Sequence, residues 1–393
     1  MCKVCLKFMV FATLLLFVVN GAKASPKGPE PEGILAGSVL IHPGAKLDIG
    51  FNSNKGHGSG DAQADGYLDA GVSLRAKLKN HPDHDWDAKT SFNWMQFFGA
   101  GDAYADYGWS VRLATNADLF KTRILRIAPL LSYSYVDQPE DENLRQDHKN
   151  HYLAGGANFT IQPGEGKIFS QKIGYTLNSF IYPSHSELTY LDHRFELLTK
   201  WNFLPVSSLT LLLDQRIIHY VGADSAGSDR NALGTPFRVK AGLNGLLLSS
   251  LSYSLGLGYS YALYHGSYKE HMFIMNADLG YEFTKDMRLS VGYKKDHENS
   301  SSGPFYKFHR IKLGYDALFI QRLSLSLAFT TSIIHFQPDQ RRDLLFGISS
   351  NLYYHFFAGL KLGIDYKMRI NRSEADLGSY MQHVVGLSFA YEY

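Results

Sequence analysis

Apolar and polar residues alternate over long stretches of this chain. From Leu251 to Leu263, leucine and tyrosine alternate with serine, glycine and alanine, and Leu360–Met368 alternates apolar residues with lysine, glycine and aspartate. Successive side chains of a β-strand point to opposite faces, so a period of two predicts strands with one apolar face and one small or polar face. The chain is therefore predicted to be all-β.

The final stretch, Met381–Tyr393, carries this pattern to the last residue, which is an aromatic. Soluble proteins seldom end on their most apolar strand, because chain ends usually fray into water. A barrel wall that faces lipid needs such a strand, and its last strand must pair with the first to leave no open edge. We therefore predict an antiparallel transmembrane β-barrel, with Phe389, Tyr391 and Tyr393 as the signal for the barrel-assembly machinery.

The pattern recurs in about 18 segments, although 16 or 20 strands remain alternative counts. The predicted strands are residues 38–52, 67–79, 85–97, 107–116, 122–136, 150–162, 167–181, 188–203, 208–221, 236–249, 251–264, 270–283, 286–295, 304–319, 322–334, 343–356, 358–370 and 379–393. A large β-sandwich, a propeller or a β-helix would also use alternating strands. Nearly every segment shows the pattern here and no blade-like repeat is visible, which favours the barrel.

Connectors between the predicted strands alternate between longer and shorter ones. Residues 53–66, 137–149 and 222–235 are long, whereas residues 249–250 and 284–285 form tight turns. Outer-membrane barrels have long external loops and short periplasmic turns. An even number of strands then predicts that both termini lie in the periplasm.

The N-terminus predicts export. Lys3 and Lys7 precede an apolar run from Phe8 to Val19, and a small-x-small cleavage site ends at Ala24. The run is short for a spanning helix, which needs roughly 20 residues, so an uncleaved anchor is the weaker alternative. We predict a signal peptide at residues 1–24, a flexible periplasmic lead-in at residues 25–37 and the barrel at residues 38–393, in the outer membrane of a Gram-negative bacterium.

Composition narrows the function classes. The formal net charge is +2, and the predicted signal contains three lysines and no acidic residue, so the mature chain is near neutral and gives no case for nucleic acid as a partner. Both cysteines, Cys2 and Cys5, lie in the signal, which leaves no disulfide or thiol chemistry. The partners expected are membrane lipid and the assembly machinery.

The polar faces of the strands carry many ionisable residues, which predicts a water-filled lumen, because a dry interior would penalise each charge by several kcal/mol. The basic residues predicted to line it are Lys46, Arg75, Lys77, Lys89, Arg112, Arg126, Lys172, Arg194, Lys200, Arg216, Arg238, Lys240, Arg288, Lys294, Arg310, Lys312, Lys361, Lys367 and Arg369. The acidic ones are Asp48, Asp69, Asp87, Asp192, Glu196, Asp214, Asp278, Glu282, Asp316 and Asp365. Basic residues exceed acidic ones by roughly two to one, which indicates either a lumen tuned to anions or an acidic polymer, or cross-strand pairs that brace a wide barrel.

Several polar clusters contain residue types that can carry chemistry. The segment 81–87 is rich in histidine and aspartate, but Pro82 makes it a turn, and the acidic segment 137–142 and the glycine-rich segment 56–61 fit solvated loops. The serine and histidine clusters at residues 184–186 and 264–268 show no orienting partner at strand spacing. We predict no catalytic residue, no metal site and no cofactor, and hence no enzyme.

The opening strand, Leu40-Ile-His-Pro-Gly-Ala-Lys-Leu-Asp-Ile-Gly-Phe-Asn-Ser-Asn54, resembles the start of the β-barrel porins that accompany bacterial exopolysaccharide systems. This resemblance implies an outer-membrane conduit for a secreted polysaccharide, with a periplasmic export protein as partner. A conduit for a polar solute or polysaccharide with a basic lumen is therefore the leading hypothesis. A general diffusion porin for small solutes is the first alternative, followed by a barrel enzyme and a structural or adhesion barrel.

Overall fold

The protein is described from a computed structural model, which covers residues 33–54, 64–78, 86–99, 109–122, 124–136, 150–164, 166–183, 189–221, 233–264, 268–298, 305–320, 322–337, 341–357, 359–374 and 379–393. Strands make up nearly all of these ranges. Within them, no helix has the length and hydropathy needed to cross a membrane.

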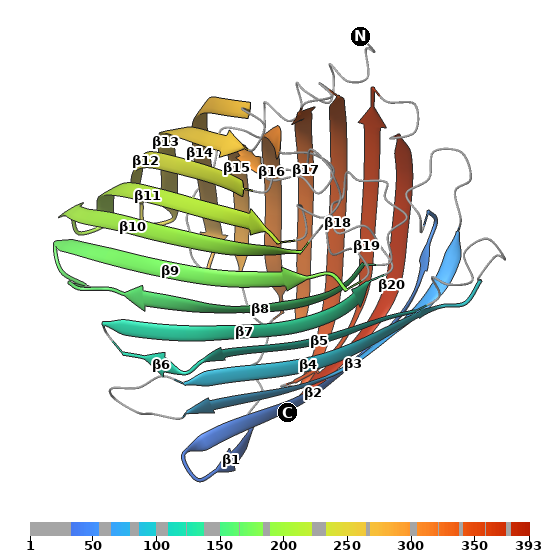
Figure 1. Cartoon of the computed structure of the whole chain (residues 1–393). Helices are drawn as coiled ribbons and strands as arrows, with labels where there is room; N and C mark the ends of the chain where they lie inside the picture. The colour runs from blue at the N-terminus through green and yellow to red at the C-terminus, as the bar shows by residue number, and fades with distance from the viewer. Residues whose placement is uncertain are drawn as a thin grey trace.

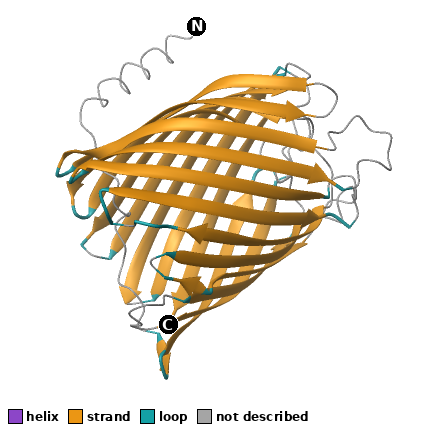
Figure 2. Ribbon diagram, turned by 60° about the vertical axis from the view of Figure 1, so that its left-hand side comes forward, coloured by secondary structure: helices purple, strands orange, loops and turns teal. Residues whose placement is uncertain are grey.

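The strands form one antiparallel sheet that closes on itself (Figures 1 and 2). They are β1 (Ile34–Ala36), β2 (Val39–Asn52), β3 (Asp65–Leu78), β4 (Asp87–Phe97), β5 (Trp109–Asp118), β6 (Phe120–Lys121), β7 (Leu125–Val136), β8 (Asn150–Ile161), β9 (Phe169–Ile181), β10 (Tyr190–Leu204), β11 (Ser207–Tyr220), β12 (Leu233–Leu248), β13 (Leu251–Tyr264), β14 (Tyr268–Thr284), β15 (Met287–Glu298), β16 (Phe305–Phe319), β17 (Leu323–Gln337), β18 (Arg342–Phe357), β19 (Leu360–Ser373) and β20 (Tyr380–Glu392).

Two of these 20 strands are short additions to the wall. β1 pairs only with the start of β2, and β6 pairs only with β7, which leaves 18 strands in the closed barrel. The 18 predicted strands are confirmed, each within a few residues of its observed bounds. The end of the lead-in predicted to be flexible, residues 25–37, contains β1.

The two ends of the chain close the barrel. β20 pairs with β19 on one side and with β2 on the other, from Gly44 opposite Glu392 to Asn52 opposite Val384. The backbone N–H of Tyr393 donates to the carbonyl of Pro43 at 2.9 Å, and the Ser388 hydroxyl donates to Asp48 at 2.6 Å. The prediction that the terminal strand pairs with the first is therefore confirmed.

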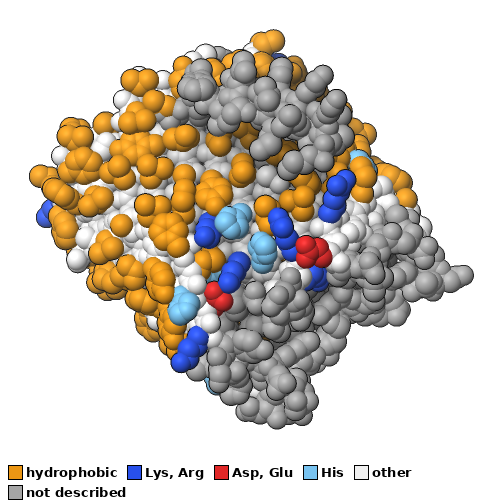
Figure 3. All heavy atoms as spheres, turned by 90° about the horizontal axis from the view of Figure 1, so that it is seen from above, with side chains coloured by type: hydrophobic (Ala, Val, Ile, Leu, Met, Phe, Trp, Pro, Cys, Tyr) orange, Lys and Arg blue, Asp and Glu red, His pale blue; other side chains and the backbone are white. Residues whose placement is uncertain are grey.

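The burial pattern is the reverse of that in a soluble protein. Outward-facing Leu257, Tyr259 and Leu387 are 53%, 52% and 59% exposed, whereas inward-facing Ser260 is 1% exposed. Hydrophobic side chains cover much of the described surface on the face that Figure 3 shows. Such an exposed apolar face, continuous over many strands, fits contact with lipid rather than with water.

Glycines on the inner face let tyrosine rings lie flat against the wall. A Cβ at Gly50 would lie 2.6 Å from the ring and hydroxyl of Tyr67, and a Cβ at Gly386 would lie 2.9 Å from the same hydroxyl. Tyr67, on β3, therefore covers both strands of the closing pair, β2 and β20. In the same way a Cβ at Gly363 would overlap the ring of Tyr353.

Substitution of Gly363 by alanine is expected to destabilise the barrel by about 1–3 kcal/mol, because the Tyr353 ring must move to admit the methyl group. The matched control is Gly347→Ala, where the nearest atoms would lie 3.9 Å from the new Cβ. The temperature at which the folded, faster-migrating form disappears on gels should fall for Gly363→Ala only. Equal melting of the two variants would contradict the glycine contact.

Candidate functional site: the barrel lumen

The strand register places the predicted lumen residues on the inner face. Arg194 lies opposite Arg216, Glu196 opposite Asp214, and Asp214 opposite Arg238, so these side chains share one surface. The same holds for the other predicted positions, such as Arg288 opposite Asp316 and Glu282. For Arg112 only the backbone is described, and it lies opposite Asn93 on the same face.

Charged groups on this face remain in contact with solvent. The side chains of Arg126, Lys294 and Lys46 are 51%, 46% and 45% exposed, although they point away from the outer surface. Barrels of 16–18 strands leave an aqueous space at their centre unless something fills it. The inner face can therefore hydrate its charges.

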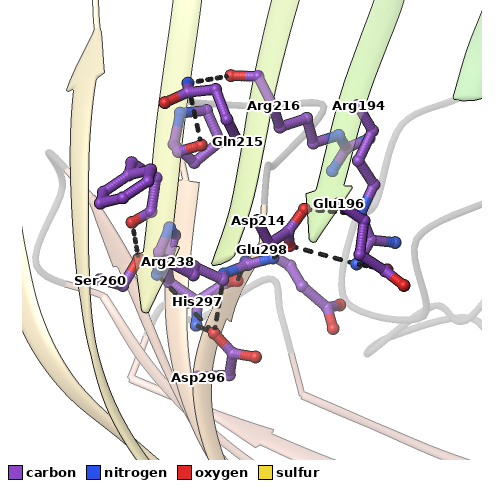
Figure 4. Close-up of polar contacts among 12 residues, drawn as sticks. Arg194, Glu196, Asp214, Gln215, Arg216, Arg238, Ser260, Asp296, His297 and Glu298 are labelled. Carbon is purple, nitrogen blue, oxygen red and sulfur yellow. Dashed lines mark hydrogen bonds and ion pairs between the residues drawn. The ribbon is translucent and has the colours of Figure 1, made fainter. Parts of the chain in front are cut away.

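A chain of ion pairs runs across β9, β10, β11 and β12 and then reaches β15, and Figure 4 shows its part from Arg194 to Asp296. We call this set the ion-pair chain; its members are Lys172, Glu196, Arg194, Asp214, Arg238 and Asp296. Lys172 Nζ lies 2.9 Å from Glu196 Oε1, and Arg194 Nε lies 2.7 Å from Asp214 Oδ1. Asp214 is almost fully buried, with its side chain 3% exposed.

Arg238 extends the ion-pair chain beyond neighbouring strands. It lies 3.5 Å from Asp214 and 3.4 Å from Asp296, and its Nη2 donates to the carbonyl of His297 at 2.7 Å. β13 and β14 lie between β12 and β15 in the sheet. The inward residue of β13 opposite Arg238 is Ser260, whose short side chain leaves the guanidinium room to pass.

Further pairs brace other parts of the wall. Arg216 binds Asp192 through two hydrogen bonds of 2.7 Å. Arg126 binds Asp118 in the same two-pronged way at 2.7 and 2.8 Å. Bidentate ion pairs, in which two guanidinium nitrogens bind both oxygens of one carboxylate, are stronger than pairs with a single contact. Arg75 binds Asp87, and Lys46 contacts Asp48 and Asp69.

The structure adds acidic residues to the predicted set. Asp65, Asp118, Asp296, Glu298 and Asp343 all fall on the inner face. Four of them lie just beyond the predicted strand ends, and Asp343 is the first residue of its predicted strand. The basic excess is therefore smaller than the two-to-one ratio counted from the sequence.

Several lumen lysines have no carboxylate partner within the described ranges. They are Lys77, Lys89, Lys200, Lys240, Lys312 and Lys367. Lys312 and Lys367 are exposed on the inner face, whereas Lys240 lies along the glycines of β13, with its Cδ 3.2 Å from where a Cβ of Gly256 would be. Because most nearby carboxylates are engaged by arginines, these lysines leave the lumen with uncompensated positive charge.

The remaining predicted lumen residues contact neutral groups or complete the inner face. The Tyr353 hydroxyl donates to both oxygens of Asp365, at 2.7 and 2.8 Å, and Lys361 Nζ lies 4.8 Å from the Tyr353 ring centre. Asp278 accepts from Asn276 at 3.4 Å, and Asp316 accepts from Ser326. Arg369 lies opposite Gly347 and Gln382 on this face.

One part of the inner face is apolar, although the alternating pattern predicts a polar inner face. Tyr306, Phe308, Ile334 and Phe336 form a buried cluster at the end of β16 and β17 nearest the longer connectors. Arg310 lies 4.8 Å and Lys294 5.1 Å from the centre of the Phe308 ring, within reach of cation–π attraction. The sequence does carry a signal for this cluster, because apolar side chains fall on both faces of the strand over residues 332–336.

The polar clusters that could carry chemistry fall largely outside the described residues. This applies to residues 56–61, to residues 81–85 of the 81–87 segment, to 137–142, to 184–186 and to 265–267. Among the residues that are described, no group of three or more histidines, cysteines or acidic residues could hold a metal ion.

Comparisons with known proteins support the barrel architecture. No protein-family model matches the sequence, and no curated protein matches it either. Among solved structures, Pseudomonas aeruginosa OccK2 (OpdF) is similar with a TM-score of 0.52 and 12% identity, over 92% of this chain and 99% of that one. Acinetobacter baumannii OccAB3 has a TM-score of 0.51 and 10% identity, over 91% of this chain and 100% of that one.

A BenF-like porin from Pseudomonas fluorescens Pf-5 is similar with a TM-score of 0.50 and 12% identity, over 91% of this chain and 99% of the porin. At these identities the likeness establishes the fold. Nothing in the comparisons supports the association with exopolysaccharide export that the opening strand implied.

Proposed function

We propose that this protein is an outer-membrane porin through which small polar solutes diffuse, with a preference for anions. The observation that carries the proposal is the solvent-exposed charge on the inner face of a closed 18-strand barrel, as in Arg126 at 51% and Lys294 at 46% exposure. A wall with charged, hydrated side chains inside and apolar side chains outside separates a polar path from lipid.

The orientation in the membrane is part of this proposal. β10–β11, β12–β13 and β14–β15 are joined at one end by two-residue turns, and the longer connectors lie at the other end. Short turns are periplasmic in outer-membrane barrels, so we take the longer connectors to lie outside the cell and both ends of the chain to lie in the periplasm. The predicted signal peptide supplies the export that this location requires.

The preference for anions follows from which charged side chains of the lumen form ion pairs. Asp192, Asp214 and Asp296 each contact an arginine, so their charge is compensated locally. Lys240, Lys312 and Lys367 have no such partner within the described chain. A passing anion therefore meets uncompensated positive charge, whereas a passing cation meets few carboxylates that are free to bind it.

Small solutes fit the comparisons better than a polysaccharide does. One similar structure is Pseudomonas aeruginosa OpdK with vanillate, and another is OccK2 in complex with glucuronate. Both ligands are small carboxylates, the class of solute that uncompensated lysines would attract. These likenesses favour a diffusion porin over the export conduit.

Liposome swelling tests the proposal. The purified barrel, reconstituted without other proteins, is placed in isotonic solutions of a monosaccharide, a tetrasaccharide, a dextran, and the sodium salt of a sugar acid. We expect rapid swelling with the monosaccharide and the sugar acid, slower swelling with the tetrasaccharide, and none with dextran. Heat-unfolded protein is the control. Liposomes that never swell would overturn the porin proposal. Entry of dextran would instead support the hypothesis of a polysaccharide conduit.

A further inference from the structure

The outer surface of the barrel carries a basic patch on one sector, near the longer connectors. We call it the outer basic patch; it comprises Lys269, Lys295, Lys307, Arg342 and Arg372, with His271, His309, His335 and His383 among them. The register fixes the outward direction, because Lys269 lies opposite Leu263, which is 41% exposed on the outer face. Every member belongs to β14–β20 and lies within a few residues of the strand end that joins a longer connector.

The distribution of outward charge is strongly one-sided. In the described strands, Glu270, which pairs with Lys307, is the one acidic side chain that meets the outward cations, and in the halves nearest the short turns no lysine or arginine faces outward. A cation on a lipid-facing surface is costly unless it meets water or an anion. Five outward cations gathered at one end of one sector therefore require a compensating environment.

The members of the patch are close neighbours. Lys307, His335 and Arg342 lie opposite one another in a single row across β16, β17 and β18, and Lys295 lies opposite His309. Two acidic residues adjoin them. Glu270 pairs with Lys307 at 2.7 Å, and the backbone N–H of Glu374 donates to the carbonyl of Arg342 at 3.0 Å. The patch therefore keeps a positive balance.

Tyrosines mark the level of the patch relative to the membrane. Tyr293 is hydrogen-bonded to His309 at 2.8 Å and Tyr366 to His383 at 2.9 Å, both on the outer face. Tyrosine belts sit at the boundary between hydrocarbon and headgroups. Figure 3 shows lysine, arginine and histidine side chains gathered at the margin of the hydrophobic surface. The patch thus lies at headgroup level.

We propose that the outer basic patch binds the phosphate groups of lipopolysaccharide, the phosphorylated glycolipid of the outer leaflet. The inference rests on the orientation in the proposed function, which places the longer connectors outside the cell. Lysine and arginine spaced along neighbouring strands suit the phosphates of a glycolipid whose acyl chains lie on the apolar wall beneath. The tyrosine–histidine pairs add hydrogen-bonding groups at the same level.

Competition binding in detergent tests this assignment. A fluorescent lipopolysaccharide is bound to the purified barrel and displaced by unlabelled lipopolysaccharide, by enzymatically dephosphorylated lipopolysaccharide, or by phosphatidylglycerol. We expect the dephosphorylated form to compete at least tenfold less well and phosphatidylglycerol to compete weakly. Equal competition by the dephosphorylated form would overturn the role of phosphate. Equal competition by phosphatidylglycerol would assign the patch to an anionic phospholipid instead.

A triple variant, Lys295→Gln, Arg342→Gln and Arg372→Gln, should lower the affinity at least tenfold. The matched control removes three cations from the lumen, Lys77→Gln, Lys89→Gln and Lys200→Gln, and should bind within twofold of the wild type. Wild-type affinity in the triple variant would contradict the assignment. Swelling of liposomes made from phospholipid alone tests the pore separately, so an active pore without lipopolysaccharide binding would reject this inference and leave the proposed function intact.

Discussion

Substitution of Asp214 by asparagine is expected to destabilise the barrel by about 2–4 kcal/mol, because one nearly buried carboxylate serves two arginines. Arg194 and Arg238 would lose an ion pair together, and the ion-pair chain would be cut at its middle. The folded form should therefore disappear at a lower urea concentration on semi-native gels. The pore should also become more selective for anions, since two arginines would lose their compensating charge.

Asp278→Asn is the matched control. Asp278 also faces the lumen, but it contacts only Asn276 among the described side chains and has no cation partner there. Both substitutions remove one negative charge from the inner face. A similar loss of stability in the two variants would mean that charge balance, rather than the shared ion pairs of Asp214, stabilises the wall.

Replacement of Lys240, Lys312 and Lys367 by glutamine is expected to lower the anion-to-cation permeability ratio by about three- to tenfold. These lysines have no carboxylate partner within the described chain, so their field acts on passing ions. The reversal potential in a bilayer under a salt gradient measures this ratio. The shift should shrink at high ionic strength, where the Debye length falls to about 3 Å at 1 M salt.

The control for the lysine variant is the double substitution Arg216→Gln with Asp192→Asn. This pair lies in the same lumen with two hydrogen bonds of 2.7 Å, and its removal leaves the net charge unchanged. The reversal potential should stay close to that of the wild type. An equal shift in both variants, or no shift in the lysine variant, would show that uncompensated lysines do not set the selectivity.

The barrel could be predicted from the sequence because a wall with lipid on one side and water on the other requires apolar and polar residues to alternate along each strand. The segment Leu251–Tyr264 shows this alternation from Leu251 to Leu263, and its strand, its outward face and its pairing were all predictable. Alternation is weaker at strand ends, where Asp65, Asp118 and Asp296 were missed as lumen residues. The strand count also followed, since β1 and β6 are too short to read as members of the wall.

The contacts inside the lumen were less predictable. Pairs on neighbouring strands, such as Arg216 with Asp192, follow once the register is known. The ion pair between Arg238 and Asp296 does not, because β13 and β14 intervene and sequence spacing carries no information on the curvature of the sheet. The apolar cluster around Phe308 was missed for a different reason, since the inner face was expected to be polar throughout.

The two interpretations of the lumen charges each describe part of the inner face. Arginines such as Arg126, Arg194 and Arg216 form the bracing pairs, whereas lysines such as Lys312 and Lys367 stay apart from the carboxylates. Arginine suits the bracing role because its planar fork can hold both oxygens of a carboxylate. Lysine leaves a mobile point charge facing the water of the lumen.

Single-channel recording of the purified wild-type barrel in a planar bilayer, with no other protein present, tests the central claim most directly. An open, hydrated lumen with uncompensated lysines should give discrete and steady conductance steps whose reversal potential indicates a preference for anions. Bilayers that contain correctly folded barrels but show no conductance steps would contradict the account.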